Sequence, residues 1–106
     1  MPTFEQTPRF IRDVKRLDSQ SMQRFREIVL KQFVPDVDEG LFRSSLRVKQ
    51  VLSAGKGAVV YEMTWAKDGR ATFQYGEEIH KGVPHVVWRR VGTHSDLGLN
   101  RDRFNG

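Results

Sequence analysis

The 106-residue chain contains no cysteine and no run of about 18 apolar residues. The first absence excludes disulfides, zinc–thiolate sites and cysteine nucleophiles, and it fits a reducing cytoplasm. The second means that no membrane span is expected. The opening stretch, MPTFEQTPRF, carries an acid and no apolar core, so no secretory signal is expected either.

Cofactor and metal motifs are missing as well. There is no Walker loop and no G-x-G-x-x-G, and the serines lack a nucleophile elbow. Three scattered histidines show no ligand spacing, so we expect no metal and no cofactor. The Gly-Lys-Gly at 55–57 lies between two predicted strands, where a hairpin turn is the simpler interpretation.

The composition supports one packed core. Hydrophobic residues make up 38% of the chain, with seven Phe and two Trp, and the length suits a single domain over 1–106. The formal charge is +5 and the pI is near 10.0, which is typical of nucleic-acid-binding domains. In many small basic proteins the charge only keeps the protein soluble. The positions of the charged residues therefore say more about function than the net charge does.

The N-terminal part has helical periodicity. After a short extended segment at 2–6, Thr7 is a capping residue and Pro8 suits the first helical position. Asp18-Ser19 ends this helix, and Ser19 or Ser21 is expected to cap the next, which should stop before Pro35. The apolar positions expected to face the core are Phe10, Val14, Leu17, Met22, Phe25, Ile28, Val29 and Phe33.

After a loop at 35–44 the hydrophobic period changes to two. Asp68-Gly69 predicts a tight hairpin, and His80 and His85 are expected on the surface of a polar connection at 76–85. The tail at 97–106 is expected to be loose. The predicted strands cover 44–52, 58–66, 70–76 and 85–93.

The order strand, helix, helix and four strands predicts an α+β fold. Two helices would pack on one face of a mostly antiparallel sheet. The other face of such a sheet is left uncovered, and functional residues are expected on that face.

Alternation along the strands assigns side chains to the two faces. With the core valines toward the helices, Val48, Val87, Arg89 and Val91 would face inward. The outer face would then carry Arg47, Lys49, Trp88, Arg90 and His94. This set is typical of a phosphate-binding groove with a stacking platform. The alternatives are that the charged residues form an ordinary solvent-exposed sheet face, that Trp88 belongs to the core, and that His94 has a structural role.

The sequence resembles the RelE/ParE superfamily of bacterial type II toxin–antitoxin toxins over about residues 4–96. The resemblance depends on FIRDVKRL, LRVKQV, VVYEMTW, DGRATF and WRRVGTH, taken in this order and spacing. The ending VGTH is most similar to the HigB-like branch.

The resemblance implies a cytoplasmic bacterial toxin that enters the ribosomal A site and cuts messenger RNA without metal, and that binds a cognate antitoxin. The 2′-hydroxyl would attack the adjacent phosphate, which requires a base, cations and an acid. Arg47 and Lys49 match the basic pair of the family's second strand, and Arg90 and His94 match positions of its last strand and tail. RNA contacts are expected from Arg43, Arg47, Lys49, Trp88 and Arg90.

Two departures leave alternatives open. Ala58 stands where RelE-like nucleases often carry Arg, and no Tyr follows the last strand. The base is therefore His94, Asp96 or Lys49. A ParE-like gyrase inhibitor, which needs no proton transfer, is the main rival. A non-catalytic member of the superfamily is the second.

Overall fold

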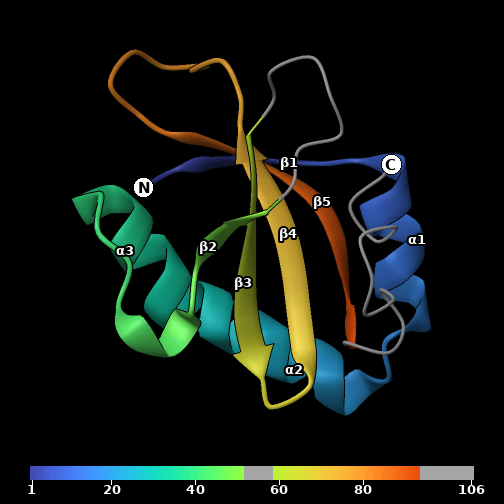
Figure 1. The fold of residues 1–106 in the computed structure, drawn as a ribbon. Coiled ribbons are helices and arrows are strands. Elements are labelled where there is room, and N and C mark those ends of the chain that lie inside the picture. The colour runs from blue at the N-terminus through green and yellow to red at the C-terminus, as the bar shows by residue number, and fades with distance from the viewer. Residues whose placement is uncertain (52–58, 94–106) are drawn as a thin grey trace.

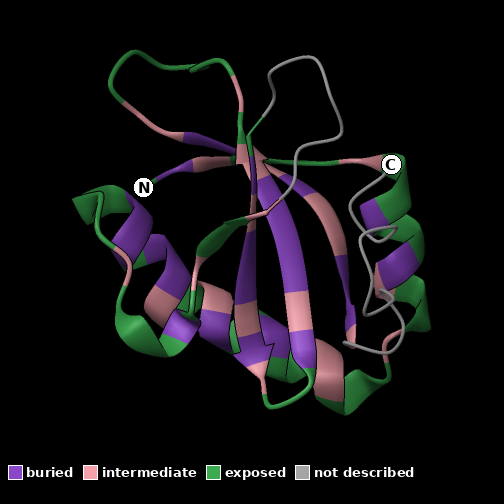
Figure 2. Cartoon of the chain, in the orientation of Figure 1, coloured by how far each residue is buried: buried purple, intermediate pink, exposed green. Residues whose placement is uncertain are grey.

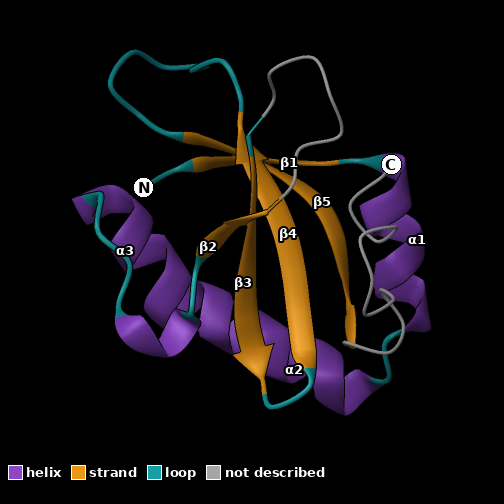
Figure 3. Cartoon of the chain, in the orientation of Figure 1, coloured by secondary structure: helices purple, strands orange, loops and turns teal. Residues whose placement is uncertain are grey.

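Strands from both ends of the chain form one five-stranded sheet, in the order β1-β5-β4-β3-β2 (Figures 1 and 3). The computed structural model describes residues 1–51 and 59–93. Neighbouring strands are antiparallel, except that β1 runs parallel to β5. The predicted α+β class and mostly antiparallel sheet are confirmed. The strands are β1 (Thr3–Gln6), β2 (Lys49–Val51), β3 (Val60–Ala66), β4 (Gly69–Tyr75) and β5 (His85–Thr93).

The helices cover one face and one edge of this sheet. Helix α2 (Ser19–Ile28) crosses behind the strands and α1 (Pro8–Arg16) lies beside β5 (Figure 1). As predicted, Thr7 caps α1 by accepting a hydrogen bond from the Phe10 N–H. The cap of α2 is Asp18 rather than Ser19 or Ser21. Its carboxylate accepts from the Ser21 N–H at 2.7 Å, and this bond holds the pKa of Asp18 below its usual value.

The predicted end of the second helix before Pro35 is wrong. The chain continues through a π-helical turn, η1 (Val29–Phe33), into α3 (Val34–Glu39). The Val34 N–H reaches back five residues to the Val29 carbonyl, and this wide turn brings Pro35 to the start of α3, where its missing N–H costs little. Gly40, with φ 76°, then ends the helix in the left-handed conformation.

The predicted 44–52 strand is mostly not a strand. Ser44–Leu46 form a 3-10 turn, η2, and Leu46 is buried in the core. Arg47 follows with φ 49°, so the chain turns before β2 begins at Lys49. Period-two alternation cannot detect this turn, because a buried Leu fits both conformations. The other three predicted strands agree with the structure to within two residues.

Aromatic rings fill the space between the helices and the sheet. Trp88 of β5 stands at their centre, with its ring centroid 5.0 to 5.8 Å from those of four phenylalanines. Figure 2 shows buried residues running along the middle strands and the inner sides of the helices. The rings around Trp88 belong to Phe10, Phe25, Phe33 and Phe73.

The helical residues predicted to face the core do so. Four of the helical positions are buried, and the remainder are partly buried against the same cluster. The buried positions are Phe10, Phe25, Ile28 and Phe33, and the partly buried ones are Val14, Leu17, Met22 and Val29.

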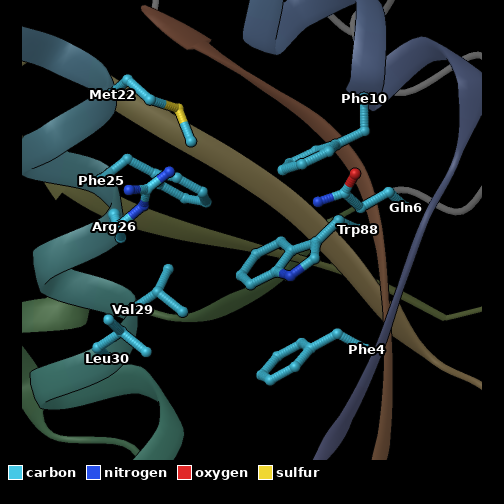
Figure 4. Close-up of a pocket in the computed structure, with 9 residues that line it drawn as sticks. All are labelled: Phe4, Gln6, Phe10, Met22, Phe25, Arg26, Val29, Leu30 and Trp88. Carbon is cyan, nitrogen blue, oxygen red and sulfur yellow. The ribbon is translucent and has the colours of Figure 1, made fainter. Parts of the chain in front are cut away.

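The prediction that Trp88 faces away from the helices is wrong. The pairing of β4 with β5 shifts between Phe73–Trp88 and Thr72–Arg90, so Arg89 is an extra residue on β5. Trp88 therefore points toward the helices, into a groove of about 240 Å³ between α2 and β1 (Figure 4). Arg89, predicted to face inward, instead donates from Nη1 to Gln74 Oε1 at 2.6 Å. Val87 pairs with Gln74 and is also turned away from the core cluster.

His85 is also placed differently from the prediction. It is buried, with Nδ1 2.7 Å from Thr3 Oγ1 and Nε2 3.1 Å from Glu5 Oε1. The parallel pairing of β1 with β5 brings these partners together, and a local sequence pattern cannot reveal such a contact. His80 is exposed, as expected.

The Asp68-Gly69 hairpin forms as predicted. The Trp65 ring lies over Gly69, where a Cβ atom would be only 2.5 Å from the ring, so glycine is required by close packing. Trp65 Nε1 donates to the Arg70 carbonyl at 3.0 Å, which holds the ring in place. None of the described helices is long and apolar enough to cross a membrane.

Replacing Trp88 tests its position in the core. We expect Trp88→Ala to lower the free energy of unfolding by about 3–5 kcal/mol, because it removes a large buried ring that packs against four phenylalanines. Guanidinium unfolding measures this change. The control is Ile79→Ala, 62% exposed, which should stay within about 0.5 kcal/mol of the parent protein. A Trp88→Ala protein as stable as the parent would show that the ring is not part of the core.

Candidate functional site

Four polar residues form a line across the sheet on the face opposite α2. Strand pairing places Lys49 opposite Glu62, Glu62 opposite Thr72, and Thr72 opposite Arg90. We call these four residues the cross-sheet row. Their neighbours along the strands, such as Met63, Phe73 and Val91, point to the core. The row therefore joins side chains from β2, β3, β4 and β5 on one face.

The Lys49 end of the row combines a cation with a buried acid. The Glu62 side chain is only 4% exposed, whereas that of Lys49 is 64% exposed, and Lys49 Nζ lies 3.7 Å from Glu62 Oε1. The two residues line a cavity of about 320 Å³ together with Arg47, Thr64 and Arg70. Lys49 thus lies on the face opposite α2, as predicted, whereas Arg47 lies in the turn before β2 and also lines a cavity with Arg24 of α2.

Arg47 adopts an uncommon backbone conformation. Its φ of 49° lies in the left-handed region, which costs a non-glycine residue roughly 1–2 kcal/mol. The turn links η2, whose Leu46 is in the core, to the edge strand β2. Positions of this kind are often found at functional sites, where the fold offsets the local strain.

At the other end of the row, Asp13 of α1 binds Arg90. Its two carboxylate oxygens accept from Arg90 Nε at 2.7 Å and Nη2 at 3.2 Å, and one of them also accepts from the Val91 N–H at 3.1 Å. Both side chains are largely buried, at 8% and 14% exposed. Strand β1 pairs with β5 only as far as Trp88, so Asp13 satisfies a backbone donor that β1 does not reach.

Arg43 belongs to a different part of the molecule. Its backbone N–H, Nε and Nη2 all donate to the carboxylate of Asp36, at 2.8, 2.8 and 2.9 Å. These bonds close the turn after α3 and hold the pKa of Asp36 below its ordinary value. The expectation that Arg43 contacts RNA finds no support in this position, because Arg43 neither belongs to the cross-sheet row nor lines its cavity.

The remaining expected site residues divide into two groups. Trp88, expected as a stacking platform, is in the core and is only 4% exposed. His94 and Asp96, the candidates for acid or base, lie outside the described residues. The structure therefore places Lys49 and Arg90 on one face, with Arg47 lining the same cavity as Lys49, and separates Trp88 and Arg43 from them.

Sequence analysis missed Glu62 and Arg70. Glu62 is the single acid in the apolar strand VVYEMTW, and a lone acid in such a strand is itself a signal of a buried polar role. Arg70 follows the hairpin turn, and its Nη1 donates to the Gly69 carbonyl at 2.9 Å. This bond holds the Arg70 side chain near the turn, beside the cavity that it lines together with Arg47 and Lys49.

The arrangement is suited to binding an anion and stabilising negative charge. Lys49, Arg47 and Arg70 supply N–H donors around one cavity, and Arg90 is oriented at the far end of the row. Glu62 adds a carboxylate, which can position Lys49 or accept a proton. Together these groups match the needs of a reaction that builds up charge on a phosphate.

No protein-family model and no curated protein sequence matches the chain. Solved structures do match. A copper-bound mutant toxin from Helicobacter pylori superposes with a TM-score of 0.62 at 14% identity, covering 92% of this chain and 100% of its own. The Escherichia coli DinJ-YafQ toxin–antitoxin complex contains a chain with TM-score 0.61 at 13% identity, covering 91% and 96%.

A third match is the archaeal RelE-RelB complex from Pyrococcus horikoshii. Its TM-score is 0.52 at 14% identity, and the match covers 87% of this chain and 93% of that one. The chain therefore has the fold of the RelE-like toxins, as the sequence resemblance implied.

The Asp13–Arg90 pair provides a test of the site's geometry. We expect Asp13→Ala to lower the free energy of unfolding by about 3–5 kcal/mol, because it leaves a largely buried guanidinium and a backbone N–H without their acceptor. The control is Asp38→Ala, which removes an exposed ion pair with the N-terminus and should cost about 1 kcal/mol or less. Equal stability of the two variants in urea unfolding would contradict the role given to Asp13.

Proposed function

We propose that this protein is the toxin of a type II toxin–antitoxin pair and that it cleaves messenger RNA on the ribosome. The cross-sheet row carries the proposal, because it brings Lys49 and Arg90 from opposite sides of the sheet onto one face. The shared fold with toxins solved alone or with their antitoxins supports it.

In the proposed reaction the ribose 2′-hydroxyl attacks the adjacent phosphorus, and the bond from phosphorus to the 5′-oxygen of the next nucleotide breaks. The products are a 2′,3′-cyclic phosphate and a free 5′-hydroxyl. A base takes the proton from the 2′-hydroxyl, and an acid donates one to the leaving 5′-oxygen. The extra charge that develops on the phosphate oxygens requires fixed cations.

Each residue of the site has a proposed part in this step. Lys49 and Arg47 bind the phosphate from the β2 side. Arg90, oriented by Asp13, stabilises the transition state from the β5 side. His94 acts as acid or base. Glu62 positions the Lys49 ammonium, which lies 3.7 Å from its carboxylate.

The proposed protein partner is a cognate antitoxin with an acidic segment. The chain's charge of +5 and the cations of the polar face favour such a partner. Charge reversal by Arg47→Glu with Lys49→Glu should weaken binding of the product of the adjoining gene by tenfold or more. Calorimetry at several salt concentrations measures this loss, since exposed charges are screened over about 8 Å at physiological ionic strength. Unchanged affinity would exclude the polar face as the contact.

The cleavage itself is tested by primer extension on a message translated in a purified system. His94→Ala should lower the cleavage rate by about 10²–10⁴ while ribosome binding persists, because proton transfer by one side chain is typically worth that much. Lys49→Ala should weaken both binding and cleavage, since it removes a phosphate ligand.

Lys81→Ala is the matched control, because it removes an exposed lysine that is distant in sequence from the row. Full cleavage by both His94→Ala and Lys49→Ala would remove these residues from the site. A parent protein that cuts nothing on the ribosome but stalls DNA gyrase would replace the nuclease proposal with the binding-module alternative.

A further inference from the structure

Three of the cations that the sequence singled out are already matched by carboxylates. Lys49 lies beside Glu62, Arg90 binds Asp13, and Arg43 binds Asp36. Their charges are therefore partly compensated within the protein. The strongest attraction for an anion must come from cations that lack such a neighbour.

Four such cations converge where β3 and β4 meet α2. Arg24 from α2, Arg47 after η2, and Lys67 and Arg70 from the hairpin line one cavity of about 330 Å³. Within the part of the chain that the structure describes, none of the four forms an ion pair with a carboxylate, and none of the described residues lining the cavity is acidic. We call this the arginine pocket.

The pocket has polar groups as well as charge. Ser45, Gln32 and Thr64 line it and can donate hydrogen bonds to oxygen atoms. Arg70 is held by its bond to the Gly69 carbonyl, so its guanidinium is partly pre-ordered. Asp68, the acid that follows Lys67 in the sequence, lies in the hairpin turn and does not line the cavity.

The arginine pocket adjoins the cavity of the cross-sheet row. Both cavities are lined by Arg47, Thr64 and Arg70. On β3, Glu62 lines only the cavity of the row, whereas Thr64, two residues or about 7 Å further along the strand, also lines the arginine pocket. This step is close to the distance between successive phosphates of an extended nucleic-acid strand. One strand could therefore place neighbouring phosphates in the two cavities.

We propose that the arginine pocket is a second phosphate-binding subsite, which holds the RNA backbone beside the nucleotide at the cross-sheet row. The inference builds on the proposed function and adds to it a binding subsite that takes no part in the chemistry. RNA is favoured over an acidic protein segment because the pocket shares three lining residues with the cavity of the row, where cleavage would occur.

The test compares Arg24→Gln/Lys67→Gln with the control Arg12→Gln/Lys81→Gln, in which exposed cations outside both cavities are changed by the same charge. Fluorescence anisotropy measures binding of a single-stranded 12-nucleotide RNA and of a dinucleotide at several salt concentrations. Removing one cation from a phosphate should lower the salt slope by about 0.7 and the affinity at ~0.1 M salt by roughly fivefold.

The pocket variant should therefore bind the 12-mer about 5- to 25-fold more weakly than the control does, with a shallower salt slope. Its affinity for the dinucleotide, whose single phosphate occupies the row alone, should be unchanged. In the ribosome assay its KM should rise while kcat stays the same, because the subsite binds substrate and transition state equally.

The subsite is overturned if the pocket variant binds the 12-mer as well as the control does, or if kcat falls at constant KM. It is also overturned if only binding of a polyglutamate peptide is weakened. A parent protein that cleaves nothing on the ribosome would refute the proposed function, whereas weaker 12-mer binding by the pocket variant would still support the subsite.

Discussion

Strand β5 changes its pairing with β4 at Arg89, and both faces of the sheet depend on that shift. On one side of it, Trp88 enters the aromatic cluster between the sheet and α2. On the other side, Arg90 turns to the opposite face and meets Asp13. Regular alternation would have put both residues on the same face, which would expose the tryptophan or bury the arginine in the core. The extra residue thus lets Trp88 pack in the core and also places the charge of Arg90 on the opposite face.

Electrostatics divide the polar face into two parts. The cross-sheet row holds cations that are matched by Glu62 and Asp13, so its geometry is well defined and its net charge is small. The arginine pocket holds cations with no carboxylate among the described residues that line it. A matched cation is oriented, which suits the stabilisation of a transition state. An unmatched cluster attracts a polyanion over a longer range, which suits binding.

Local chemistry explains which elements could be predicted from the sequence. The Thr7 cap, the Asp68-Gly69 hairpin and the bounds of β5 follow from contacts within a few residues, and all three agree with the structure. The path through Pro35 could not be predicted, because a π-helical turn compensates for the proline. The burial of His85 was also hidden, since its partners in β1 are about 80 residues away.

The sequence by itself determined the α+β class, the helical residues that pack in the core, and the presence of Lys49 on a polar strand face. These follow from hydrophobic period and side-chain alternation, which are local properties. Only the tertiary structure decided how the cations of the row are compensated, because Asp13 reaches Arg90 from a helix and Glu62 reaches Lys49 from the neighbouring strand. It also decided which face of the sheet Trp88 lies on, and it placed Arg24 of α2 in one cavity with Lys67 and Arg70 of the hairpin. Neither a register shift nor a contact between distant elements changes the hydrophobic period of the sequence, so neither can be predicted from that period.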